Sequence, residues 1–290
     1  MEKAVMVNTR AQLRLISFAG YDRLYFGSEF CQKLIPEAGD LKEAFRYARG
    51  HNLSFSLLTP YVTNKGIRAL RPLFEEASLT GAPCEVIVND WGVLRLLNRR
   101  YGSLVPVLGR LLTKQKRSPE LERLLSRSRK PVPFCVVNKS SGGKKIVVFP
   151  KQLPRSLDAY YKGSNVSSVA VIQDFLTENR VARIELDNTA QGLHLELGAS
   201  NIAVSLYLPY VYISTTFLCP TAGCAAHPHS HSRECRRECG KYFFKLRHKA
   251  MPKIIYLKGN SLFYKNSRFC LEQGQRQSVN RIVYCPDALL

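Results

Sequence analysis

The feature that most constrains the fold is an alternation of short apolar runs with longer amphipathic segments between residues 53 and 109. The run LSFSLLTPYV at 53–62 is almost continuously apolar, as expected for a strand buried on both faces. Further along, the predicted elements are a helix at 64–81, a strand at 85–90, a short helix at 91–100 and a strand at 104–109. Strands that alternate with helices over short connections predict a parallel sheet.

The same pattern extends toward both ends of the chain. Two short strands are predicted at 12–18 and 23–27, followed by a helix that Asp40 begins and Gly50 ends. Later strands are predicted at 181–188, at 201–215, within 253–266 around a Gly259-Asn260 turn, and within 280–290. An α/β barrel commonly uses about 250 residues as one domain. We therefore expect an α/β fold of the (β/α)-barrel type, with residues 1–290 as a single domain.

A cysteine-rich segment at 215–244 interrupts the alternation. Its proline, glycine and serine residues argue against a regular helix or strand, and a loop of this length has no core of its own. The segment contains C-x4-C and C-x3-C pairs with three histidines between them, namely Cys219, Cys224, Cys235, Cys239, His227, His229 and His231. This density of soft ligands predicts a metal-binding loop, since free cysteines prefer burial and the loop is too polar to bury four.

The spacing leaves the metal open. Four thiolates at such spacings suit either zinc or an iron–sulfur cluster, although zinc knuckles usually have tighter C-x2-C pairs. The histidines could bind zinc, shield a cluster or only add solubility.

Positive charge is concentrated in two regions. The chain carries a formal charge of +21, and residues 95–155 hold 16 Lys and Arg against 2 acidic residues. Residues 233–253 hold 8 against 2, and the remainder is close to neutral. We interpret 110–168, where the strand–helix order is lost, as a basic insertion outside the barrel. Segregated positive charge favours RNA or another polyanion as a partner, and a merely solvated surface is the alternative.

Compartment and membrane association follow from composition. No run approaches the roughly 20 apolar residues that span a bilayer, so no transmembrane segment is expected. The N-terminal residues lack the apolar centre of a signal peptide. Nine cysteines, an odd number, favour a reducing compartment, the cytoplasm, over disulfides.

Five segments carry a resemblance to a known family. They are LYFGSEFC (24–31), VNDWGVLRLL (88–97), RIELDN (183–188), LPYVYISTTFLC (208–219) and ECRRECGKYFF (234–244). In order and spacing the chain resembles the collagenase-like peptidases, peptidase family U-thirty-two, and is most similar to the iron–sulfur proteins of oxygen-independent ubiquinone biosynthesis. Residues 110–168 have no counterpart in that pattern.

The resemblance implies a barrel body and a 4Fe–4S cluster held by four cysteines. The implied ligands are Cys31, Cys219, Cys235 and Cys239, with Cys224 as an alternative to Cys31 as the fourth. Cys31 and Cys219 each follow a predicted barrel strand, so they are expected to meet at the C-terminal end of the barrel, where barrel sites are built.

The resemblance also implies oxygen-independent hydroxylation or an accessory redox role, with a partner subunit, and includes family members that act on RNA. Peptidase activity has no support, since neither a Ser–His pair nor an HExxH helix is recognisable. Asp90 and Asp187 end predicted strands, and Arg236 and Arg237 flank the late cysteines. These four residues are the candidates for binding a substrate, and the alternative function is a zinc or iron–sulfur protein that binds or modifies RNA.

Overall fold

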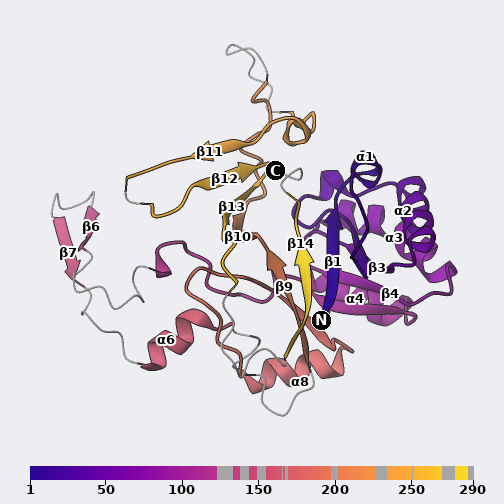
Figure 1. The fold of residues 1–290 in the computed structure, drawn as a ribbon, viewed down its shortest axis with the longest axis horizontal. Helices are drawn as coiled ribbons and strands as arrows, with labels where there is room; N and C mark the ends of the chain where they lie inside the picture. The colour runs from indigo at the N-terminus through magenta and orange to yellow at the C-terminus, as the bar shows by residue number, and fades with distance from the viewer. Residues whose placement is uncertain are drawn as a thin grey trace.

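The structure is a computed structural model in which eight parallel strands close into a barrel. It describes residues 1–122, 133–137, 144–148, 155–164, 166, 169–196, 202–225, 234–249, 251–269 and 278–286. The order of strands around the barrel is β1-β14-β9-β8-β5-β4-β3-β2, so the first and last strands of the chain are neighbours (Figure 1). The predicted α/β-barrel fold is therefore confirmed.

The barrel strands are short and mostly buried, which agrees with their apolar sequences. In chain order they are β1 (Glu2–Val7), β2 (Arg23–Gly27), β3 (Ser54–Leu58), β4 (Cys84–Val88), β5 (Leu104–Leu108), β8 (Arg183–Asp187), β9 (Ala203–Leu208) and β14 (Val279–Tyr284). Every neighbouring pair is parallel.

Amphipathic helices cover the outside of the barrel and bury their apolar faces against it. These helices are α1 (Arg10–Leu13), α2 (Ala38–Gly50), α3 (Asn64–Leu79), α4 (Trp91–Arg100) and α8 (Ala170–Glu178). The other described helical elements are α6 (Arg155–Lys162) and the 3-10 turns η1 (Gln32–Leu34) and η2 (Glu238–Gly240). The main core lies between strands and helices, where residues such as Leu70, Phe74 and Leu97 are fully buried.

A four-stranded antiparallel sheet is inserted between the last two barrel strands. It consists of β10 (Tyr210–Thr215), β11 (Phe244–Leu246), β12 (Ile255–Lys258) and β13 (Ser261–Lys265), in the order β10-β13-β12-β11. Figure 1 shows this sheet beyond the arrowheads of β9 and β14, at the C-terminal end of the barrel. The cysteine-rich loop connects β10 to β11 and therefore lies at the end of the barrel where sites are expected.

Two strand predictions are wrong in detail. Residues 12–18 do not form a strand, because Thr9 caps the short helix α1 there by accepting from the Gln12 N–H; the first strand is β1 instead. Residues 201–215 form two strands rather than one. The chain turns at Pro209, so β9 belongs to the barrel and β10 to the antiparallel sheet. Cys219 therefore does not follow a barrel strand as predicted.

The basic segment begins inside the barrel body rather than as a separate unit. Arg110 and Thr113 are fully buried and Arg117 nearly so, because their side chains bond to groups at the end of the barrel. Further along, β6 (Pro133–Val137) and β7 (Lys144–Val148) form an antiparallel two-stranded sheet, and neither strand pairs with a described barrel strand. Most of 123–154 lies outside the described residues. No helix in the described part of the chain is both long and apolar enough to cross a membrane.

Candidate metal centre

A cavity of about 100 Å³ lies between the C-terminal end of the barrel and the antiparallel sheet. Its barrel side is formed by residues that follow the strands, including Asn8 after β1, Arg110 after β5 and Cys285 after β14. Its other side is formed by the cysteine-rich loop and the β12–β13 turn. The inserted sheet therefore encloses the position that is the active-site mouth in a barrel of this type.

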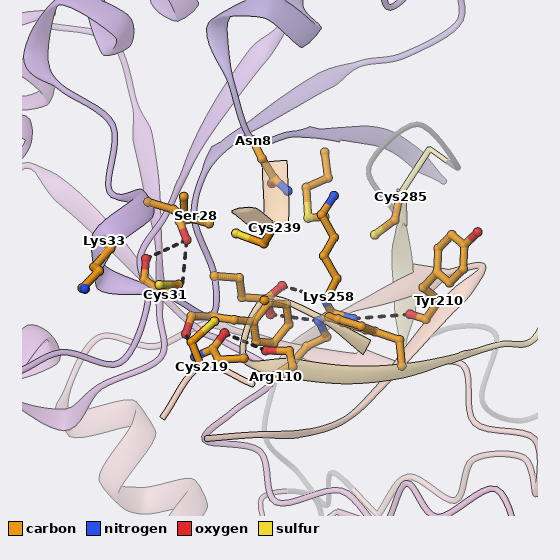
Figure 2. A pocket seen from close by; sticks show the side chains of 18 of the residues that line it. Asn8, Ser28, Cys31, Lys33, Arg110, Tyr210, Cys219, Cys239, Lys258 and Cys285 are labelled. Carbon is orange, nitrogen blue, oxygen red and sulfur yellow. Dashed lines mark hydrogen bonds and ion pairs between the residues drawn. The ribbon is translucent and has the colours of Figure 1, made fainter. Parts of the chain in front are cut away.

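Among the described residues five cysteines line this cavity, and four of them, which come from three separate segments, are the ligands that the resemblance implied. Cys31 follows β2, Cys219 follows β10, Cys235 precedes η2 and Cys239 lies within it. Figure 2 shows Cys31, Cys219 and Cys239 around one space, with Cys285 apart from them. All four residues that the resemblance implied as ligands are thus brought together.

The thiols influence one another electrostatically. Burial raises the pKa of Cys239 to about 11, and the nearby thiols of Cys219, Cys31 and Cys235 add to the shift. Burial also raises the pKa of Cys31, with Cys219 and Cys235 contributing. The thiolate is the form that binds a metal, so binding at this site has to release protons.

The thiols stand around the cavity rather than converge on one point. Within the described ranges, no three Cys, His, Asp or Glu side chains lie close enough together to hold a metal ion. A single zinc ion needs four sulfurs about 2.3 Å from one centre, whereas a 4Fe–4S cluster takes one thiolate at each of four separate irons. Four thiols that line one cavity are therefore a suitable set of donors for a cluster. To bind one zinc ion, the four sulfur atoms would have to move closer together.

Asn260 joins the two loops that carry Cys31 and Cys219. Its Nδ2 donates to the backbone carbonyls of Phe30 and of Thr216, each at 2.9 Å, and the residue is buried. The residue before it, Gly259, has φ +60° and lies against Cys239, so the tight turn between β12 and β13 touches a third thiol-bearing segment. The Gly259-Asn260 turn, which the sequence predicted, therefore connects the segments that carry Cys31, Cys219 and Cys239.

Glu238 fixes the remaining part of the loop. One carboxylate oxygen accepts from the Gly223 N–H and the other from the Arg236 N–H, both at 2.9 Å. The N–H groups of Glu238 itself and of Gly223 lower the pKa of this carboxyl. A charged acceptor between the first and second cysteine pairs holds them at a fixed separation.

A buried ion network lies directly beneath the cavity. Arg110 binds the Glu29 carboxylate through two N–H groups, at 2.9 and 2.5 Å, and binds Asp187 at 2.7 Å. Arg117 binds the other oxygen of Asp187 at 2.5 Å. Because Glu29 is two residues from Cys31, the network sets the position of that cysteine loop against the barrel. Burying such charges is tolerable only with this degree of pairing.

Deeper in the barrel, two carboxyl groups have opposite electrostatic character. Burial raises the pKa of Glu185 to about 8, and its carboxyl lies 2.8 Å from the Tyr25 hydroxyl and 2.5 Å from the Tyr207 hydroxyl. Burial by itself raises the pKa of Glu85 as well. Hydrogen bonds from Arg281 and the charge of Arg23 outweigh this effect, so the pKa of Glu85 is lowered. Glu185 is therefore neutral at pH 7 and Glu85 is charged.

The four predicted substrate-binding residues are not available to a ligand in the cavity. Asp187 contacts the network but is fully buried and held by two arginines, so it is not open to a substrate. Asp90 accepts from the Gly92 and Val93 N–H groups as the N-cap of α4 and does not line the cavity. Arg236 and Arg237 are exposed and lie outside the cavity lining.

Cys224, the alternative fourth ligand, is exposed and does not line the cavity. Cys285, which the sequence did not single out, is buried in the cavity wall. Burial raises the pKa of Cys285 to about 12. The three histidines at 227, 229 and 231 lie outside the described residues.

Several residues of the centre were not identified from the sequence. Lys258 lines the cavity beside Cys239, and burial lowers the pKa of its ammonium group while the Cys239 thiol opposes that shift. Arg110 was counted only as part of a basic insertion, although its place directly after a predicted strand was a signal. Asn260 was recognised as a turn residue and not as a bridge.

Comparison of the chain with protein families, with curated proteins and with solved structures finds no match. The resemblance to the collagenase-like peptidases therefore stays a hypothesis that rests on the five sequence segments.

Proposed function

We propose that this protein is an iron–sulfur protein in which Cys31, Cys219, Cys235 and Cys239 hold a 4Fe–4S cluster. The observation that supports the proposal is that these four thiols line one cavity at the C-terminal end of a barrel, whereas Cys224 is exposed outside it. Cys285 also lines the cavity, but it lies apart from the other labelled cysteines (Figure 2). The donor set consists of soft thiolates alone, which is what such a cluster takes from protein.

We further propose that the chain works in oxygen-independent hydroxylation or as an accessory redox subunit, in the cytoplasm, with a family-related partner subunit. A bound cluster supplies one-electron redox chemistry. The chain's own residues enclose the site: the antiparallel sheet restricts water, and Arg110 and Asn260 fix the loops that carry the ligands. Lys258 and Asn8 present polar groups to the same cavity and are the candidates for orienting a substrate there.

The experiment is replacement of single cysteines followed by anaerobic reconstitution. Cys31→Ala, Cys219→Ala, Cys235→Ala and Cys239→Ala should each lose most of the bound iron and sulfide per chain. Cys224→Ala is the matched control, because it removes a thiol from the same loop without touching the cavity, and it should retain full occupancy. Full occupancy in a cavity variant, or a loss in the control equal to the losses in the cavity variants, contradicts the ligand assignment.

A second candidate function is RNA binding or modification with zinc or a cluster as a structural centre. It is favoured by the exposed segment 241–249, which combines three aromatic rings with Lys241, Lys245, Arg247 and Lys249. Basic side chains interleaved with exposed rings are typical of single-stranded nucleic-acid binding. Binding of a uridine oligonucleotide that weakens steeply with salt supports this candidate. If the purified protein is also colourless and contains zinc, RNA binding with a structural zinc centre takes the place of the cluster proposal.

A further inference from the structure

A second hollow adjoins the thiol cavity and shares part of its wall. It is a groove of about 550 Å³ between the start of α2, the helix α3 and the segment 235–237. Cys235 and Lys33 line both the groove and the thiol cavity. Cys235, a proposed cluster ligand, thus borders both the thiol cavity and an open surface groove.

The groove has an apolar floor and a basic rim. Ile35, Pro36, Pro72 and Leu73 provide the apolar part. Among the described residues of its lining, the cations are Lys33, Lys65 and Arg237 and the acid is Glu37.

The three cations are available to a partner. All three are exposed, and no ion pair holds any of them within the part of the chain that the structure describes. Arg237 is also placed there by a left-handed backbone conformation, φ +61°, which a residue with a side chain adopts only when its surroundings enforce it.

We propose that this basic groove is the docking site of a small acidic one-electron carrier protein, which reduces the cluster through its Cys235 side. The proposal rests on the proposed function. One electron leaves the reduced carrier, which becomes oxidised, and the cluster gains that electron; no bond forms or breaks.

The combination of floor and rim favours a protein over the other anions that a basic surface attracts. A phosphate backbone has no apolar surface to place on Ile35, Pro36 and Leu73, whereas an acidic protein with an apolar centre has one. Exposed cations contribute chiefly by steering the encounter, which suits the small, short-lived interfaces of electron-transfer partners. Such an encounter needs two features: exposed charges that steer the carrier to the groove, and a short path from the groove to the cluster. The basic rim provides the first, and Cys235, which lines both hollows, provides the second.

The test measures binding of a plant-type 2Fe–2S ferredoxin, a small acidic carrier, to the reconstituted full chain by calorimetry. The double variant Lys65→Glu, Arg237→Glu, which spares Lys33 because that residue also lines the thiol cavity, should bind about tenfold or more weakly than the unchanged chain, whose affinity should itself fall as salt is raised. The matched control changes Arg95 and Arg99 to Glu, two exposed residues of α4 that line neither hollow, and it should bind almost normally. Equal losses in both double variants, or no ferredoxin binding at low salt, overturn the proposal.

A second readout separates docking from cluster assembly. Iron per chain is measured on the same samples, and the groove variant should keep it. Its reduction by ferredoxin should slow by about the same factor as binding weakens, while its reduction by methyl viologen radical, a small cation that needs no docking and that the introduced carboxylates attract, should not slow. If the unchanged chain holds no iron, the proposed function fails instead. If a uridine oligonucleotide binds the unchanged chain and loses affinity in the groove variant only, the groove is a nucleic-acid site and the carrier proposal is wrong.

Discussion

Replacement of Glu185 by glutamine should stabilise the protein above pH 6, because the folded chain keeps this carboxyl protonated. The pKa of Glu185 is raised by burial from 4.5 to about 8. Between those two values the unfolded chain has released the proton and the folded chain has not, so stability falls as pH rises. One bound proton corresponds to about 1.4 kcal/mol per pH unit, or about 5 kcal/mol over the whole window.

Glu185→Gln has an uncharged side chain of the same shape, whose amide can meet the hydroxyls of Tyr25 and Tyr207. Urea unfolding of the variant and the unchanged chain at pH 5.5, 6.5 and 7.5 gives the difference in unfolding free energy, from which the other titrating groups cancel. The variant should gain about 3 kcal/mol on the unchanged chain between pH 5.5 and 7.5. Parallel stabilities across these pH values refute the assignment of a neutral, buried Glu185.

Glu85 provides a control of opposite sign. Its carboxylate accepts from Arg281 at 2.6 and 2.9 Å, and its pKa is lowered, so the charged form contributes stability above the unfolded pKa. Glu85→Gln should therefore destabilise the protein at pH 7 by about 3–5 kcal/mol, since Arg281 is left buried with a weaker partner. That loss should shrink as pH falls below about 4.5, where the unchanged chain also loses the charge. A gain in stability at pH 7 contradicts the ion-pair account.

Three further predictions concern the loops of the centre. Asn260→Ala removes two partly buried hydrogen bonds between loops, so it should cost about 2 kcal/mol and lower the iron per chain. Asn266→Ala breaks a hydrogen bond outside the cavity and should spare the iron; equal iron in both variants contradicts the bridging role. Arg110→Met leaves the buried Glu29 carboxylate without its arginine and leaves Asp187 with Arg117 alone, so it should cost about 3–5 kcal/mol in urea unfolding, and a loss below 1 kcal/mol contradicts the network. Glu238→Gln keeps one acceptor of two, and a chelator should remove iron from it several times faster than from the unchanged chain; an unchanged rate contradicts the role of Glu238.

The barrel could be predicted because its strands are buried on both faces. The predicted strands at 85–90 and 104–109 contain the unbroken apolar runs 86–88 and 104–108, and the structure places β4 and β5 there within one or two residues. The run 201–215 is equally apolar, so its composition could not show that Pro209 divides it between two sheets. Residues 12–18 alternate like a strand, but a capped helical turn at their start excluded one.

The candidate centre was predictable only where chemistry was local. The resemblance identified four cysteines, and the structure places all four on one cavity. The bonds that position them connect residues far apart: Asn260 meets Phe30 across 230 residues, and Arg110 meets Glu29 across 81. Such partners depend on the closed barrel and on the inserted sheet, and sequence periodicity carries no information about them. Asp90 is the opposite case: its position at a strand end suggested a site residue, but its side chain caps the helix α4.

The central claim is that the four thiols hold an iron–sulfur cluster, and its most direct test is the metal content of the chain purified without oxygen. Iron, acid-labile sulfide and zinc are measured per chain on one sample, together with the absorbance spectrum. The account predicts about four iron and four sulfide per chain, a brown colour with broad absorbance and little zinc. One zinc per chain in a colourless protein without sulfide contradicts it.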